Sequence, residues 1–220
     1  SSAWDLIFCT RQICDHNLFY RGSSLNFPLC LYPNGDLPED LFTQDNGRVP
    51  NLSSRFVETI SAKLSMRFIG EGSGDLRKTV GPEDIFHYAY AVLHSPTYRT
   101  RYADFLKTDF PRIPLIGDIG LFRALATKGA ELVSLHFLES PKLQEFLTTW
   151  PVKGDNSVEK VSYAEELKRV WINRTQYFDG VPKAVWEFHI GGYQVCEKWF
   201  KDRKGRKLSY DELTSTRKSS

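Results

Sequence analysis

The sequence lacks the features that mark a membrane-spanning or exported protein. Its mean hydropathy is −0.38, and no apolar run approaches the ~20 residues that a membrane-spanning helix needs. The first eight residues contain no cation, and their apolar stretch is too short for the core of a signal peptide. We therefore expect a cytoplasmic protein with no membrane contact.

Cysteine and methionine are also scarce. The chain of 220 residues has one methionine and four cysteines, and no two cysteines form a Cys-x-x-Cys pair. This spacing argues against the common zinc and disulfide motifs, so we expect no metal site and reduced, buried thiols. Hydrophobic residues make up 41% and charged residues 25% of the chain, values close to those of ordinary globular proteins.

Motifs for catalysis are absent or incomplete. The stretch 72–79 superficially resembles a phosphate loop, but no glycine directly precedes its lysine. His87 and His94 are seven residues apart, whereas a zinc protease needs a spacing of four. The chain also has no glycine-rich cofactor loop. We predict no catalytic residue and no cofactor in this chain, and an independent hydrolase that uses Asp84 and His87 is a third interpretation.

Charge is distributed unevenly along the chain. The net charge is only +2, but residues 191–220 hold eight cations and four anions, a local net charge of +4. Such a basic segment is typical of a surface that faces phosphates, although a solvated lysine-rich tail has the same composition.

The hydrophobic periodicity predicts an α+β fold whose first two-thirds is helical. Helices are expected at 53–64, 82–95, 96–106 and 118–138, because apolar residues recur there at helical spacing after capping residues or proline. Strands are expected near the N-terminus, at 6–9 and 25–32. A small antiparallel sheet between residues 158 and 177 and short helices at 182–188 and 193–202 complete the prediction.

Four stretches together resemble the C-terminal specificity domain of the type ISP restriction-modification enzymes. The resemblance runs from about residue 20 to residue 212, and it is carried by 27–33, 81–99, 109–115 and 190–206. It implies a long bacterial polypeptide with a nuclease, an ATP-driven translocase, an adenine-N6 methyltransferase and a final domain that reads an asymmetric DNA site. S-adenosylmethionine, ATP and Mg²⁺ would then act in the other domains.

The sequence departs from the family pattern at both ends. The region from Leu6 to Leu18 is shorter than the pattern, and beyond Leu213 the chain is polar where the family tends to continue as a helix. We therefore expect a target-recognition domain over residues 1–213 and a disordered tail over residues 214–220.

The chemistry of base recognition suggests which residues contact DNA. Arginine can bind guanine, and asparagine or glutamine can bind adenine, through two hydrogen bonds to one base edge. We expect base readout from Asn173, Arg174, Gln176 and Gln194, although 172–177 also fits a polar turn and Gln194 also fits a cap of its own turn. Phosphate contacts are expected from the following cations, which also fit a solvated face: Lys198, Lys201, Arg203, Lys204, Arg206 and Lys207.

These residues predict a DNA-recognition module without chemistry of its own. Its expected partners are double-stranded DNA and the methyltransferase domain of the same polypeptide. The alternative is a scaffold domain that docks a methyltransferase and contacts DNA only weakly.

Overall fold

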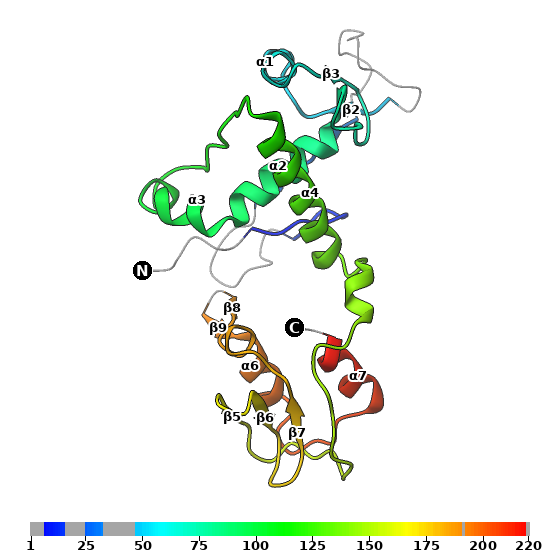
Figure 1. Ribbon diagram of the computed structural model, residues 1–220, viewed down its shortest axis with the longest axis vertical. Helices are drawn as coiled ribbons and strands as arrows, with labels where there is room; N and C mark the ends of the chain where they lie inside the picture. The colour runs from blue at the N-terminus through cyan, green and yellow to red at the C-terminus, as the bar shows by residue number, and fades with distance from the viewer. Residues whose placement is uncertain (1–6, 16–24, 33–46, 191, 219–220) are drawn as a thin grey trace. The chain divides into compact units, whose positions relative to one another are not determined.

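The computed structural model describes residues 7–15, 25–32, 47–190 and 192–218 (Figure 1). The chain forms two compact units, residues 7–137 and residues 138–220. The first unit is mainly helical, and the second combines a small antiparallel sheet with short helices. The predicted α+β class is therefore confirmed, and the recognition domain expected over residues 1–213 contains two units.

The first unit has four α-helices and two short strand pairs among its described residues. Antiparallel strands β1 and β2 precede the first helix, and parallel strands β3 and β4 follow it. Ser53 and Asp118 cap α1 and α4, because their side chains accept hydrogen bonds from backbone N–H groups three residues on. In chain order the elements are β1 (Cys30–Leu31), β2 (Val49–Pro50), α1 (Ser54–Leu64), β3 (Arg67–Phe68), β4 (Thr79–Val80), α2 (Pro82–His94), α3 (Pro96–Arg101), the 3₁₀ turn η1 (Phe105–Lys107) and α4 (Ile119–His136).

Helices α2 and α4 lie side by side and enclose the core of the first unit (Figure 1). The ring centroids of Tyr88 and Phe122 are 4.9 Å apart between the two helices. A Cβ atom on Gly129 would lie 1.8 Å from the carbonyl oxygen of His87, so only glycine permits this approach. The contact fixes the spacing of the two helices.

The N-terminal strands are shorter than predicted. Residues 7–9 form no strand, residue 6 lies outside the described residues, and of 25–32 only Cys30 and Leu31 pair with another strand. Pro28 has no N–H group to donate to a ladder. Asn51 instead donates its side-chain amide to the carbonyl of Pro28 at 2.9 Å and its backbone N–H to that of Leu29 at 2.8 Å.

The second unit is built on the antiparallel sheet β5-β6-β7. Its buried apolar side chains come from the sheet and the residues beside its strands, from α6, from α7 and from the segments before β5 and α7. They are Val158, Val170, Ile172, Phe178, Val181, Phe200, Leu208 and Leu213. In chain order the elements are the 3₁₀ turn η2 (Pro141–Gln144), β5 (Ser162–Ala164), β6 (Arg169–Trp171), β7 (Tyr177–Asp179), α5 (Lys183–Trp186), β8 (His189–Ile190), β9 (Tyr193–Gln194), α6 (Val195–Lys201) and α7 (Tyr210–Lys218).

Two details of the second unit differ from the prediction. The helix expected at 193–202 begins only at Val195, because Tyr193 and Gln194 pair with β8. The tail expected at 214–220 is helical as far as Lys218, and residues 219–220 lie outside the described residues. Ser209 and Glu212 explain the helix, because each accepts a hydrogen bond from the backbone N–H of the other, at 3.2 and 2.9 Å. This reciprocal capping box stabilises the first turn of α7.

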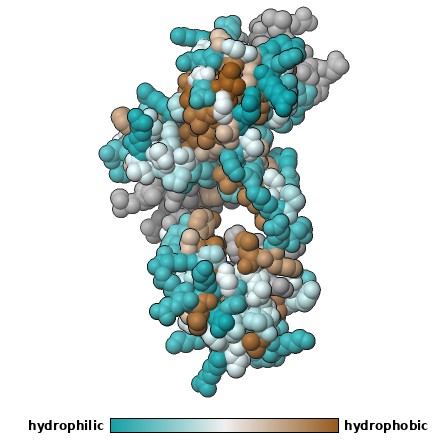
Figure 2. Space-filling model, in the orientation of Figure 1, coloured by the Kyte–Doolittle hydropathy of each residue, from teal (hydrophilic) through white to brown (hydrophobic). Residues whose placement is uncertain are grey.

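Hydrophilic residues cover most of each unit on the face that Figure 2 shows. No helix within the described ranges is long and apolar enough to cross a membrane. The four cysteines are free thiols, and each is half-buried rather than fully buried as expected.

Candidate nucleic-acid interface

The turn between β6 and β7 carries three of the four residues expected to read bases. Asn173 shapes this turn, because its Oδ1 accepts hydrogen bonds from the backbone N–H groups of Thr175 at 3.0 Å and Gln176 at 2.7 Å. Its Nδ2 donates to the carbonyl of Ser157 at 2.9 Å. The Asn173 amide is therefore committed to holding the turn in place.

Gln176 is completely buried below the turn, with 0% of its surface exposed. Its Oε1 accepts hydrogen bonds from the backbone N–H of Asn156 at 2.9 Å and from Asn173 Nδ2 at 3.0 Å. Its Nε2 donates to the carbonyl of Val152 at 3.2 Å and to Asn156 Oδ1 at 2.9 Å. Both amides are thus used inside the protein, and in this conformation neither offers a base two free positions.

Arg174 lies exposed between these two anchored residues. Within the described part of the chain its guanidinium makes no hydrogen bond and no ion pair, which leaves all five N–H donors available. The turn below it is fixed by Asn173 and Gln176. Arg174 is thus a free arginine fork on a well-defined turn.

Gln194 is half-buried in β9. Its Nε2 donates to the carbonyl of Trp186 at 2.5 Å, which ties the β8–β9 hairpin to the end of α5. Asparagine or glutamine needs both its donor and its acceptor to recognise adenine. Gln194 therefore fits the interpretation in which it braces its own hairpin.

Two of the expected phosphate-binding lysines on α6 are paired with carboxylates of the same helix and its C-terminal residue. Lys198 Nζ lies 2.5 Å from Asp202 Oδ1, and Lys201 Nζ lies 2.9 Å from Glu197 Oε2. Exposed pairs at this helical spacing contribute only about 0.3–0.5 kcal/mol each. A phosphate can compete for such lysines, but the neighbouring carboxylates cancel most of their field.

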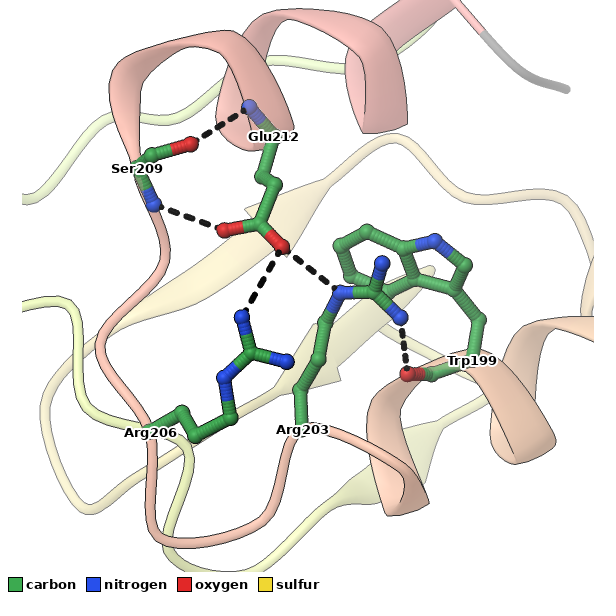
Figure 3. A network of polar contacts seen from close by, with 5 residues as sticks. All are labelled: Trp199, Arg203, Arg206, Ser209 and Glu212. Atoms are coloured by element: carbon green, nitrogen blue, oxygen red, sulfur yellow. Dashed lines mark hydrogen bonds and ion pairs between the residues drawn. The ribbon is translucent and has the colours of Figure 1, made fainter.

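Arg203 is the centre of a polar network that joins the end of α6 to α7 (Figure 3). Its guanidinium carbon lies 3.7 Å from the centroid of the Trp199 ring, and Nη1 donates to the Trp199 carbonyl at 3.0 Å. Nε donates to Glu212 Oε1 at 3.0 Å, and the side chains of Arg203 and Glu212 are each only 23% exposed. Arg203 thus has a structural role in joining the end of α6 to α7.

The Glu212 carboxylate also interacts with Ser209 and Arg206. The backbone N–H of Ser209 donates to it, and this bond together with Arg203 lowers the pKa of the Glu212 carboxyl below its usual range. Arg206 Nη2 lies 3.9 Å from the same carboxylate, but the Arg206 side chain is 63% exposed. Arg206 is therefore held loosely and stays accessible.

Lys204 and Lys207 are exposed and form no ion pair among the described residues. They lie on the turn after α6, where Gly205 has a φ of +80° that favours glycine. Lys207 also contributes to lowering the pKa of the Asp155 carboxyl, whose main cause is the hydrogen bond from the Ser157 hydroxyl. These lysines retain the charge that a phosphate contact needs.

The segment 156–158 brings the two turns together. Its Ser157 carbonyl accepts a hydrogen bond from Asn173 in the β6–β7 turn. Three backbone hydrogen bonds of 2.8–2.9 Å join it to the turn after α6: the N–H of Val158 donates to Arg206, that of Gly205 to Val158, and that of Leu208 to Asn156. We call the exposed cations on these turns the cationic edge, and they are Arg174, Lys204, Arg206 and Lys207. No motif in the sequence points to a role for segment 156–158, whose local signal is the turn-forming run Gly154-Asp155-Asn156.

Asp84 and His87, the pair considered for a hydrolase, both lie in the packed region around α2. The Asp84 carboxylate is buried and accepts hydrogen bonds from the backbone N–H groups of Gly74 and Gly81 at 2.6 and 2.8 Å. Burial lowers the pKa of the His87 imidazole. Among the described residues no three His, Cys, Asp or Glu side chains are grouped as a metal site would require.

Comparisons with known proteins identify a family. A model of the type ISP C-terminal specificity domain matches residues 1–219. A comparison with curated proteins finds no match. Among solved structures the fold is similar to that of the ATP-dependent type ISP restriction-modification enzyme LlaBIII bound to DNA, with 20% identity and a TM-score of 0.54 over 93% of this chain and 13% of that chain.

Two further solved structures show weaker similarity. The DrdV–DNA complex has 23% identity and a TM-score of 0.48 over 81% of this chain and 18% of that chain. A nuclease-deletion mutant of the type ISP enzyme LlaGI, in complex with a DNA substrate mimic, has 24% identity and a TM-score of 0.45 over 62% of this chain and 12% of that chain. The present chain thus spans less than a fifth of the length of these proteins.

Proposed function

The chain belongs to the type ISP C-terminal specificity domain family, and on this premise we propose that it recognises double-stranded DNA as the target-recognition module of a bacterial restriction-modification enzyme. The parent polypeptide would contain an adenine-N6 methyltransferase, an ATP-dependent translocase and a nuclease. S-adenosylmethionine, ATP and Mg²⁺ would bind to those other domains. The present chain would contribute specificity and no bond-making step.

The cationic edge is the observation that supports this proposal most directly. Its four side chains are exposed on two turns that are hydrogen-bonded to the same segment, 156–158. A buried amide network holds one turn, and backbone hydrogen bonds hold the other. Cations on a fixed support meet phosphates without a further loss of backbone freedom on binding.

We infer that the residues of the cationic edge contact different parts of the DNA. Arg174 can present two parallel N–H donors to the O6 and N7 atoms of a guanine, which distinguishes one base pair from the others. Lys204 and Lys207 are single ammonium groups on flexible stems, and they suit phosphates, which are alike at every step. Arg206 lies close to Glu212 and is best suited to a backbone contact.

A scaffold role is the second candidate, because the β8–β9 hairpin exposes large apolar side chains. Phe188 is 56%, Ile190 39% and Tyr193 62% exposed. An exposed apolar group of this size is typical of a protein contact. The methyltransferase domain of the same polypeptide is the partner that we propose for this hairpin.

A salt titration of DNA binding separates the two candidates. Affinity for a duplex of mixed sequence should fall steeply with salt, and Lys204→Gln should make the log-log slope less steep by about 0.9 for the phosphate contact it loses. Lys168→Gln is the matched control, because Lys168 is exposed at the opposite end of β6 from the Arg174 turn. Equal slopes for both variants, or no binding at low salt, would favour the scaffold role.

A further inference from the structure

A second group of cations lies in the first unit, on the glycine-containing segment that the sequence analysis compared with a phosphate loop. We call residues 70–79, which follow β3 and end on the first residue of β4, the Asp75 loop. Asp75 Oδ1 accepts hydrogen bonds from the backbone N–H groups of Arg77, Lys78 and Thr79 at 2.8–2.9 Å. These three bonds lower the pKa of the Asp75 carboxyl far below its usual range.

The same three bonds exclude one mode of phosphate binding and favour another. In a phosphate loop, backbone N–H groups converge on the anion. Here Asp75 takes that position, so the backbone cannot cradle a bound phosphate. The loop conformation is instead set by its own carboxylate, and the side chains of Arg77 and Lys78 are left exposed.

The Asp75 loop is fastened to both neighbouring helices. Arg123 of α4 donates from Nε and Nη2 to the carbonyl of Leu76 at 2.9 and 2.8 Å. Asp84 of α2 binds the backbone N–H groups at Gly74 and Gly81. A Cβ atom on Gly74 would lie 2.4 Å from the carbonyl oxygen of Thr79, which shows how closely the loop folds on itself.

Four cations therefore have fixed backbone positions around one loop. Arg67 lies directly opposite Thr79 in the β3–β4 pair, and its N–H donates to the carbonyl of Lys78 at 2.8 Å. Arg123 is exposed apart from its two bonds to Leu76. We call this group the loop cations, and it consists of Arg67, Arg77, Lys78 and Arg123.

The carboxylates around the loop are mostly occupied. Glu71 is ion-paired with Arg48, and Glu83 accepts a hydrogen bond from the Ser73 hydroxyl at the α2 side of the loop. Within the described ranges no carboxylate forms an ion pair with Arg67, Arg77 or Lys78. With Glu71 paired to Arg48, the four loop cations formally outnumber the carboxylates of Asp75, Glu83 and Asp84 by one, so the region around the loop has a small net positive charge.

We propose that the loop cations form a second DNA-binding surface, which contacts backbone phosphates independently of the cationic edge. The proposal rests on the proposed function, since it adds a contact by the first unit to the same double-stranded DNA. Duplex DNA carries one negative charge per about 1.7 Å of helix axis, so it offers a phosphate to each cation of such a group. Because phosphates carry no sequence information, this surface adds affinity and not specificity.

The test compares two double variants of the chain in salt titrations with a DNA duplex. Arg77→Gln with Lys78→Gln removes two loop cations whose side chains form no hydrogen bond or ion pair with any described residue, and it leaves the backbone hydrogen bonds to Asp75 intact. Arg55→Gln with Lys128→Gln is the control, because it removes the same charge from exposed helix positions of the same unit. We expect the loop variant to make the slope less steep by about 1.8, so that its affinity deficit shrinks about twelvefold between 50 and 200 mM salt.

The possible outcomes separate this inference from the proposed function. If the loop variant and the control have equal slopes while Lys204→Gln still changes the slope, the loop cations do not bind DNA and the proposed function stands. If the wild-type chain fails to bind DNA at low salt, both proposals are wrong. A parallel assay with anionic lipid vesicles adds one more arm, and loss of vesicle binding without loss of DNA binding would contradict the DNA assignment.

Discussion

The Nε of Arg203 lies 3.0 Å from Oε1 of Glu212, and this hydrogen bond joins α6 to α7 beneath the stacked ring of Trp199 (Figure 3). Removal of Arg203 takes away a hydrogen bond between two charged side chains that are each only 23% exposed. We predict that Arg203→Ala lowers the free energy of unfolding by about 1.5–3 kcal/mol, as expected for a lost hydrogen bond between charged groups. Lys204→Ala should change it by less than about 0.5 kcal/mol. Urea unfolding monitored by tryptophan fluorescence measures both, and equal values would contradict the structural role of Arg203.

The buried amide network gives a second prediction. Gln176→Ala removes the hydrogen-bond partner of three part-buried groups: the backbone N–H of Asn156, the side-chain Oδ1 of Asn156 and the carbonyl of Val152. We therefore expect the free energy of unfolding to fall by about 2–3 kcal/mol. Arg174→Ala, two residues away and exposed, should cost less than about 0.5 kcal/mol. Denaturant titrations of the two variants measure this difference in unfolding free energy. A small loss for Gln176→Ala would show that this side chain is free for another role.

Local sequence signals predict the helices of the first unit, but they do not predict the internal contacts of several polar residues. Helices α1, α2 and α4 have strong local signals, such as the Ser53 cap and the proline and acids that open α2. The roles of Gln176 and Arg203 depend on contacts with Asn156 and Glu212, which are distant along the chain. A polar residue on an exposed turn and one buried beneath it have the same local sequence signal, and only the fold distinguishes them.

Acid pH should destabilise the first unit through a histidine cluster between α2 and α4. Tyr90 Oη lies 2.5 Å from His136 Nδ1, and the His94 and His136 ring centroids are 5.4 Å apart. Burial, with the charge of Arg99 and His136, lowers the pKa of His94 to about 4, and burial also lowers the pKa of His136. Both rings are thus neutral in the folded protein at a pH where they take up protons in the unfolded chain.

The lowered pKa values of His94 and His136 mean that the folded protein loses stability as the pH falls. An unfolded histidine titrates near pH 6.5, so stability is fully present above that value and is lost as the pH falls from about 6.5 toward 4. Thermal unfolding at several pH values between 7.5 and 5 measures the slope of Tm against pH. His94→Asn should flatten it, whereas His189→Asn, at an exposed position of β8, should leave it unchanged. An unchanged slope for His94→Asn would refute the cluster as the cause.

The close contact between α2 and α4 is testable at one glycine. A methyl group at Gly129 would meet the His87 carbonyl oxygen, which belongs to the backbone and cannot turn away. We predict that Gly129→Ala destabilises the protein by about 3 kcal/mol or more. On the same helix, a Cβ atom on Gly120 would lie 3.2 Å from Oδ1 of the capping Asp118, a side-chain atom that can yield by a few tenths of an ångström, so Gly120→Ala should cost far less than Gly129→Ala. Thermal denaturation of the two variants provides the comparison, and similar midpoints would mean that the helices can adjust.

Selection from a random pool of DNA duplexes will show whether this chain reads a DNA sequence. The wild-type chain should enrich one asymmetric sequence, and Arg174→Ala should lose the preference at one position, at a cost of about 1–3 kcal/mol on the selected site. Lys204→Gln should enrich the same sequence with weaker binding to every duplex. If the wild-type chain binds the pool but enriches no sequence, it is a non-specific DNA-binding domain and not a target-recognition module.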